Sequence, residues 1–198
     1  MTLEELKAEI LSKTPEDFVE EHIINGSSEY FSEEQLSFVT EHLSVATGVD
    51  IRPEEIVIVG SAKLGFGLFE KTKRDGTVLP AMRPFDGDSD IDIAFACPAL
   101  FDLIWNEIAT YARAKPRMPH RMDKLGDYMV YGWIRPDHIP KEARLRTFDL
   151  WNDRIRRLPV NPKMNRRKIS GALYRDIEFL KKYQARGISA CKMKLELE

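Results

Sequence analysis

Two strand-like stretches, joined by a long loop rich in Gly, Lys and Pro, limit the folds open to this chain. Ile56–Val59 consists only of β-branched residues and is followed directly by Gly60, which is typical of a buried strand. Residues 90–97 alternate acidic or small side chains with large apolar ones, so they predict a second strand with two unlike faces. With helical segments around both strands, the sequence predicts an α/β fold.

Helix signals flank these strands on both sides. Capping boxes begin at Thr2 and Ser32, and Thr14 precedes a proline that suits a first helical turn. Gly48 gives a stop signal after the second box, and Pro98 opens a helix with an apolar stripe. The sequence also predicts helices at residues 148–158 and 176–186 and a strand at residues 168–174.

Length and composition fit one globular domain without a disulfide framework. The chain has 198 residues, of which 43% are hydrophobic, and this is enough to bury a core. Neither the two cysteines, Cys97 and Cys191, nor the four histidines show the spacing of zinc ligands. No apolar run is long enough to span a membrane, so no membrane partner and a cytoplasmic location are expected.

The net charge of −2 hides a strong asymmetry along the chain. Residues 1–60 hold 14 acidic and 3 basic residues, a net charge of −11, whereas residues 113–194 hold 22 basic and 8 acidic residues, a net charge of +14. Two interpretations remain open. Either the basic part meets a polyanion such as a triphosphate or a nucleic acid, or the two halves pair with each other or with a partner protein.

Asp90 and Asp92 are predicted to lie side by side on one face of the second strand. Two such carboxylates repel each other unless a cation neutralises them, and Mg²⁺ prefers one or two carboxylates together with phosphate oxygens. The alternative is a solvated acidic turn, because Asp86 and Asp88 precede the pair. An EF-hand loop is excluded, because its glycine and final glutamate have no counterpart at the required spacing. Metal-dependent glycosyltransferases also use Asp-x-Asp, but their α/β domains are usually larger than this chain allows.

Gly60 and Ser61 supply a second polar feature, at the end of the first strand. A glycine there lets a ligand approach the backbone, and the serine adds a hydroxyl and N–H groups for an anion. Lys63, two residues further on, offers a cation to phosphate. The segment is not a P-loop, since no Gly-Lys-Ser/Thr follows. A lone Gly-Ser is an ordinary turn, and it is the order of the two motifs on consecutive strands that predicts a nucleotide site.

This pair of motifs resembles the signature of the DNA polymerase β-type nucleotidyltransferase superfamily, in which a strand ending in Gly-Ser precedes a strand carrying Asp-x-Asp. The resemblance covers residues 54–112 and points to small stand-alone bacterial members associated with antiviral defence and toxin–antitoxin systems. It implies that Gly60 and Ser61 bind a triphosphate such as ATP. It also implies that Asp90 and Asp92 are catalytic ligands of Mg²⁺, with Mn²⁺ as a substitute.

The resemblance implies a short mixed sheet of the polymerase β type, flanked by N- and C-terminal helices. One nucleotidyltransferase-like domain is then expected over residues 1–198, with a helical N-terminal part at 1–53, a motif-bearing core at 54–112 and a basic C-terminal part at 113–198. The implied reaction is attack by an acceptor hydroxyl on the α-phosphate, with pyrophosphate leaving. The acceptor is an RNA, a protein or a nucleotide.

A third carboxylate separates two predicted functions, because active members of the superfamily carry one on a later strand. The candidates are Asp149, Asp127 and Asp176. With such a group beside the Asp-x-Asp pair, the chain is predicted to be a Mg²⁺-dependent nucleotidyltransferase. Without it, the prediction is a catalytically silent module that binds a nucleotide or a partner protein. RNA binding through the basic C-terminal part is a third hypothesis and predicts steep salt dependence without Mg²⁺.

Further aromatic and basic residues have two interpretations each. Tyr128, Tyr131 and Trp133, with Arg121 and Arg135 nearby, form either a base-stacking surface or part of the core. The arginines at 74 and 83 and the basic stretch at residues 154–168 are either phosphate or RNA contacts or solvated surface groups.

Overall fold

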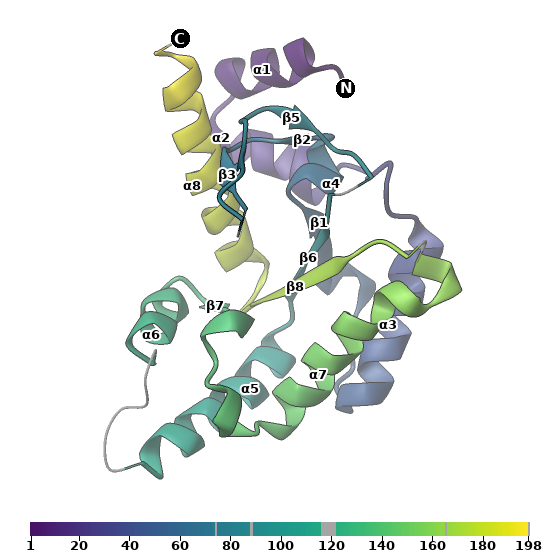
Figure 1. The fold of residues 1–198 in the computed structure, drawn as a ribbon, viewed down its shortest axis with the longest axis vertical. Coiled ribbons are helices and arrows are strands. Elements are labelled where there is room, and N and C mark those ends of the chain that lie inside the picture. Colours follow the sequence, from purple (N-terminus) through teal and green to yellow (C-terminus); the bar gives the residue numbers. More distant parts are fainter. Residues whose placement is uncertain (74, 88, 116–121, 165, 198) are drawn as a thin grey trace.

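A computed structural model describes the chain except for residues 74, 88, 116–121, 165 and 198 (Figure 1). Arg74, Asp88 and Arg121, which were considered above, therefore lie outside the described residues. No described helix is long and apolar enough to cross a membrane.

The centre of the molecule is a four-stranded mixed sheet with the strand order β1-β6-β8-β7. β6 and β8 run parallel, whereas β1 pairs antiparallel with β6 and β7 pairs antiparallel with β8. The α/β class and three of the four strands are confirmed, and β7 was not predicted. The bounds are Ile56–Val59 for β1, Ile91–Ala96 for β6, Trp133–Ile134 for β7 and Ile169–Tyr174 for β8.

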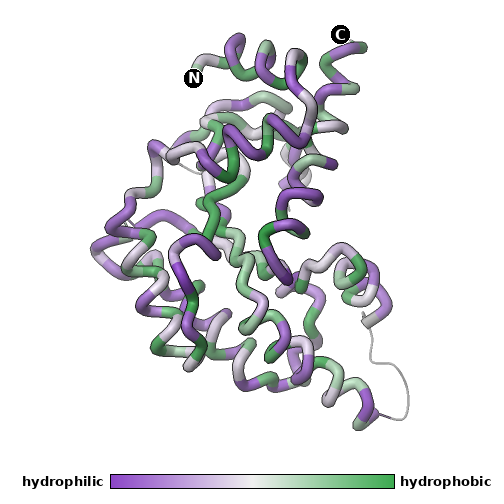
Figure 2. The backbone as a smooth tube through the Cα atoms, turned by 180° about the vertical axis from the view of Figure 1, so that it is seen from behind, coloured by the Kyte–Doolittle hydropathy of each residue, from purple (hydrophilic) through white to green (hydrophobic). Residues whose placement is uncertain are grey.

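Helices cover both faces of this sheet, which gives three layers (Figure 1). Side chains alternate along β6, so Ile91, Ile93 and Phe95 pack on one side, and Ala94 and Ala96 on the other. The first side is covered by α3 (Glu33–Thr47), α5 (Pro98–Arg113) and α7 (Arg146–Arg157), and the second by α1 (Leu3–Ser12), α2 (Pro15–Phe18), the π-helical segment η1 (Val19–Ile24) and α8 (Ile177–Leu195). In Figure 2 the flanking helices mix hydrophilic and hydrophobic residues, as expected where one side faces a core.

The predicted helix starts and stops in the N-terminal part are confirmed. Thr2 and Ser32 form complete capping boxes, and the side chain of Thr14 accepts a hydrogen bond from the N–H group of Asp17. Gly48 ends α3 with φ of 70°, a left-handed conformation that glycine adopts without strain.

The long loop before β6 contains secondary structure of its own. It begins with the short helix α4 (Ser61–Leu64), and two small antiparallel ladders then form an arm, defined here as residues 66–84. The ladders pair β2 (Phe66–Gly67) with β5 (Arg83–Pro84), and β3 (Lys71–Thr72) with β4 (Val78–Leu79).

After α5 the chain forms short elements that prolines separate. The predicted helix at 148–158 is α7, and the one at 176–186 is the start of the longer α8. Helix α6 was not predicted, and a glycine at position 126 weakens its helical pattern. The remaining elements are η2 (Pro53–Glu55), α6 (Met122–Val130), η3 (Pro136–His138), η4 (Lys141–Ala143), η5 (Leu158–Val160) and η6 (Pro162–Met164).

Ion pairs join the acidic and the basic parts of the chain. Glu20 pairs with Lys181 at 2.8 Å, and Glu34 pairs with Lys163 at 3.6 Å. Pairing between the two halves therefore accounts for part of the charge asymmetry.

Candidate functional site

A cavity of about 1430 Å³ lies where β1 ends and β6 and β8 begin. The sheet contributes Asp92, Ser170 and Tyr174, and the strand-to-helix turn contributes Gly60 and Ser61. The arm, the segment from α6 to η3 and one side of α8 form the other walls. The volume exceeds the usual range of roughly 300–1,000 Å³ for small-molecule sites, so it has room for a nucleotide.

Gly60 lies directly against the carboxylate of Asp92. Its backbone has φ of 66° and ψ of −149°, a region that is essentially restricted to glycine. A Cβ atom added at Gly60 would lie 3.1 Å from Oδ2 of Asp92. The pairing of Val59 with Asp92 across the antiparallel ladder produces this contact. The structure therefore brings the two sequence motifs together.

Asp92 is a largely buried carboxylate in the cavity wall. Burial raises its pKa above the usual range, a hydrogen bond donated by the hydroxyl of Ser170 opposes the rise, and the charge of Asp90 adds to it. Ser170 occupies the paired position on β8. Burial therefore makes an uncompensated negative charge on Asp92 unfavourable.

Asp90 precedes β6 and is neutralised by Lys168. The ammonium group of Lys168 lies 2.6 Å from Oδ2 of Asp90, and the side chain of Lys168 is 74% exposed. The carbonyl of Lys168 accepts a hydrogen bond from the N–H group of Ile91, which sets the two side chains opposite each other. The described cavity lining includes Asp92 and does not include Asp90.

Lys63 is not brought to this cavity. Its ammonium group donates to the carbonyl of Gly26, and burial lowers its pKa. Arg83 does line the cavity, but its guanidinium is held by the carbonyls of Phe69 and Pro80, at 2.7 and 3.1 Å. Both side chains therefore have structural partners, and of the two only Arg83 lines the cavity.

The three candidates for a third carboxylate lie in different places. Asp149 is on α7, where burial and Glu107 raise its pKa, and it is not part of the described cavity lining. Asp176 caps α8 by accepting hydrogen bonds from the N–H groups of residues 178 and 179. Asp127 lines the cavity from α6.

On the strand next to Asp92, the side chains facing the acidic pair are those of Ser170 and Lys168. Side chains alternate between the two faces of a strand, so a strand at residues 168–174 has these two side chains and Tyr174 on one face. This arrangement could have been predicted from the sequence. Within the described residues, no third acidic, histidine or cysteine side chain joins Asp90 and Asp92 at ligand distance.

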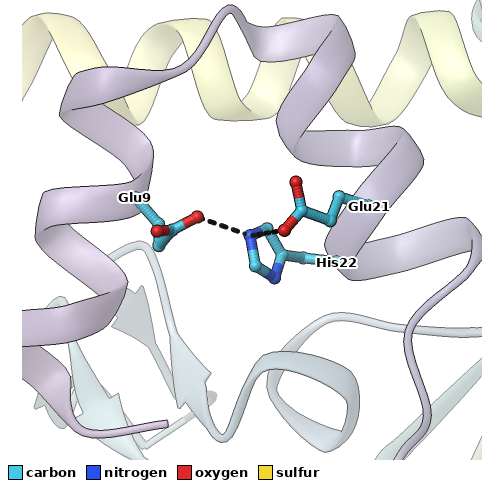
Figure 3. A group of neighbouring side chains, drawn as sticks. All are labelled: Glu9, Glu21 and His22. Atoms are coloured by element: carbon cyan, nitrogen blue, oxygen red, sulfur yellow. Dashed lines mark hydrogen bonds and ion pairs between the residues drawn. The ribbon is translucent and has the colours of Figure 1, made fainter.

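A separate acidic group lies between α1 and η1 (Figure 3). Nε2 of His22 is 2.9 Å from Glu9 and 3.8 Å from Glu21. The ammonium group of Lys13 also contacts both glutamates, so the charges of this cluster are compensated by the chain itself. The cluster joins two helical segments and requires no metal ion.

The far wall of the cavity is aromatic. It is lined by Tyr128, Tyr131 and Trp133, for which the sequence left open a stacking surface or a core position. Tyr174 from β8 and Tyr183 from α8 also line it. The last two were not identified from the sequence, because their approach depends on the way α8 packs on the sheet.

Comparison with known proteins adds no identification. No protein-family model, curated protein or solved structure matches this chain.

Proposed function

We propose that this protein has a nucleotidyltransferase-like fold and binds a nucleoside triphosphate in the cavity without transferring its nucleotidyl group. The observation that carries the proposal is the contact of Gly60 with Asp92 at the cavity wall. At this contact a backbone position without a side chain meets a carboxylate, and Ser61, the next residue along the chain, also lines the cavity. Phosphates approach such a backbone closely, and a carboxylate there holds their metal counter-ion.

The acidic pair suits Mg²⁺ as that counter-ion. Asp90 and Asp92 would supply oxygen ligands to Mg²⁺, which also binds phosphate oxygens and water. Lys168 forms an ion pair with Asp90. Because the side chain of Lys168 is exposed, it can turn to solvent or to a phosphate at little cost in free energy. When bound, Mg²⁺ neutralises the phosphates and supplies Lewis acidity, while the backbone at Gly60 and the hydroxyl of Ser61 orient the triphosphate.

The residues next to Asp92 favour binding over transfer. The resemblance calls for a third carboxylate on a later strand, and the neighbouring strand presents a hydroxyl at Ser170 and a cation at Lys168. Neither group activates an acceptor hydroxyl as a carboxylate base does. The chain then acts as a nucleotide sensor, or as the nucleotide-dependent partner of another protein.

Nucleotidyl transfer to an RNA, protein or nucleotide acceptor is the second candidate, and one observation favours it. Asp127 lines the same cavity from α6 and is exposed, so it is available to a substrate there. In that case Asp127, which lies outside the sheet, replaces the third carboxylate.

Calorimetric titration of ATP, GTP, CTP and UTP, with and without Mg²⁺, tests the proposal. We expect Mg²⁺-dependent binding that weakens about two- to tenfold in Ser61→Ala, because one neutral hydrogen bond is worth about 0.5–1.5 kcal/mol. Ser12→Ala, on the outer helix α1, is the matched control and leaves the affinity unchanged.

Two results decide against this proposal. Absence of binding for all four nucleotides, or equal affinities in wild type and Ser61→Ala, removes the triphosphate site. Release of pyrophosphate, or label from an α-labelled nucleotide on an RNA or protein, shows that the second candidate is correct.

A further inference from the structure

Five aromatic residues line one side of the cavity, named here the aromatic wall. It consists of Tyr128, Tyr131, Trp133, Tyr174 and Tyr183. The ring of Trp133 lies 5.0 Å from Tyr128, 4.8 Å from Tyr183 and 5.7 Å from Tyr174, centre to centre. Four of these rings come from α6, β7, β8 and α8, and Tyr131 directly follows α6, so the tertiary fold builds the wall.

Two guanidinium groups lie on this wall. That of Arg135 is 5.1 Å from the ring centre of Tyr128 and 5.5 Å from that of Trp133. That of Arg186 is 5.2 Å from the ring centre of Tyr131, whose residue is 48% exposed. Aromatic rings with arginine planes form the surface on which proteins stack nucleic-acid bases.

Two buried polar atoms beside the wall have no hydrogen-bond partner within the described chain. They are Nε1 of Trp133 and Nδ1 of His138, and both residues line the cavity. Both rings also contact the ring of Tyr128, at 5.0 and 5.1 Å. An unpaired buried donor or acceptor costs free energy, so these atoms favour a ligand with polar groups of its own.

The aromatic wall is continuous with the end of the cavity that holds Gly60 and Asp92. Ser170 and Tyr174 lie on the same face of β8, four residues and therefore about 13 Å apart along the strand. Asp92, Ser170 and Tyr174 all line this cavity. One ligand can therefore contact both ends.

We infer that the aromatic wall binds the base of the nucleotide whose phosphates lie at Gly60 and Ser61. The inference rests on the proposed triphosphate site and adds the part of the ligand that this site leaves unassigned. The flat, polar-edged base stacks on the wall, and its edge is offered the N–H group of Trp133 and the imidazole nitrogen of His138.

A comparison of MgATP with magnesium tripolyphosphate tests this inference, since the second ligand has the phosphates without base or ribose. In wild type, MgATP binds at least about tenfold more tightly, because stacking on an aromatic residue contributes on that scale. Tyr131→Ala and Trp133→Phe reduce this ratio several-fold and leave the tripolyphosphate affinity unchanged. Trp105→Ala is the matched control, since this exposed aromatic residue on α5 is outside the described cavity lining.

The outcomes separate this inference from the proposed function. Equal affinities for the two ligands in wild type overturn the inference and leave the triphosphate site standing. A ratio that neither Tyr131→Ala nor Trp133→Phe changes overturns it as well. If neither ligand binds wild type, the triphosphate site itself is absent and the inference falls with it.

Discussion

Two parts of this molecule hold neighbouring acidic groups neutralised by a lysine, and they differ in how that lysine is held. Between α1 and η1, Lys13 contacts Glu9 and Glu21. At the sheet edge, Lys168 contacts Asp90, with Asp92 two residues further along. By charge and residue type, the two clusters look alike.

Their surroundings are opposite. The side chain of Lys13 is 24% exposed, and its backbone carbonyl also accepts a hydrogen bond from Lys192 on α8. Lys168 is 74% exposed, and the structure gives its ammonium group one acidic partner. Lys13 therefore connects three helical segments, whereas Lys168 is an exchangeable counter-ion beside a cavity. Under the proposed function, a replaceable cation and adjoining space distinguish the sheet-edge pair from the structural cluster, since a cluster of acids alone also occurs in a structural contact.

The largest expected effect tests the sheet edge through Gly60. Gly60→Ala places a Cβ atom 3.1 Å from Oδ2 of Asp92 in a backbone region that costs about 1–3 kcal/mol for other residues. We expect an equivalent loss of unfolding free energy in denaturant titration. We also expect at least about a tenfold loss of MgATP affinity, corresponding to about 1.4 kcal/mol.

Gly48→Ala is the control for this substitution. Gly48 also has a positive φ, but a Cβ atom there meets nothing within 4 Å. It is expected to lose stability and keep its nucleotide affinity. Equal nucleotide affinity in Gly60→Ala and wild type would show that the glycine serves only the turn.

An intermediate effect distinguishes the two lysines directly. Lys13→Met removes a cation with several partners, so we expect a lower thermal midpoint. Lys168→Met leaves the midpoint nearly unchanged, because an exposed ion pair contributes about 0–1 kcal/mol. It strengthens Mn²⁺ binding up to about fivefold, since the metal no longer competes with an ammonium group. Scanning calorimetry and Mn²⁺ titration by electron paramagnetic resonance measure these values.

The opposite ranking of midpoints would break the comparison. A lower midpoint in Lys168→Met than in Lys13→Met would make Lys168 the structural cation, and weaker Mn²⁺ binding in Lys168→Met would make it a ligand-organising group.

Local patterns were sufficient to predict the elements that carry their own signals. The β-branched run of β1, the alternation of β6 and the capping boxes of α1 and α3 depend on neighbouring residues, and each is found where expected. Of the site residues, Gly60 and Asp92 were predicted and lie in contact.

The rest of the site depends on contacts between distant segments. Lys63 was expected near phosphate because it follows Gly-Ser, but the path of residues 26–28 gives its ammonium group a carbonyl partner. Ser170 reaches Asp92 through the parallel pairing of β6 with β8, which joins residues 78 positions apart in the sequence. Tyr183 reaches Trp133 only because α8 packs across the sheet. No short sequence pattern encodes such pairings.

The smallest expected effect concerns Asp92 and pH. Burial raises the pKa of Asp92 in the folded protein above its value in the unfolded chain. Between these two values the folded state binds more protons than the unfolded state, so the free energy of unfolding falls as pH rises. Asp92→Asn has no such titration, so its stability does not fall in this way. In metal-free buffer, we expect the thermal midpoint of Asp92→Asn minus that of wild type to increase with pH. At neutral pH, the midpoint of the variant is expected to be equal to or higher than that of wild type. For a chain of this length, about 1 kcal/mol corresponds to about 2–4 °C.

Asp75→Asn is the control of opposite sign, because hydrogen bonds from Thr77 lower the pKa of Asp75 and the contribution of Asp75 to stability grows with pH. A midpoint difference between Asp92→Asn and wild type that stays constant, or falls with rising pH, would mean that Asp92 is stabilised as a charge by the fold itself. The sheet-edge acids would then be a structural cluster like the one around Lys13, and no cation would be needed to complete them.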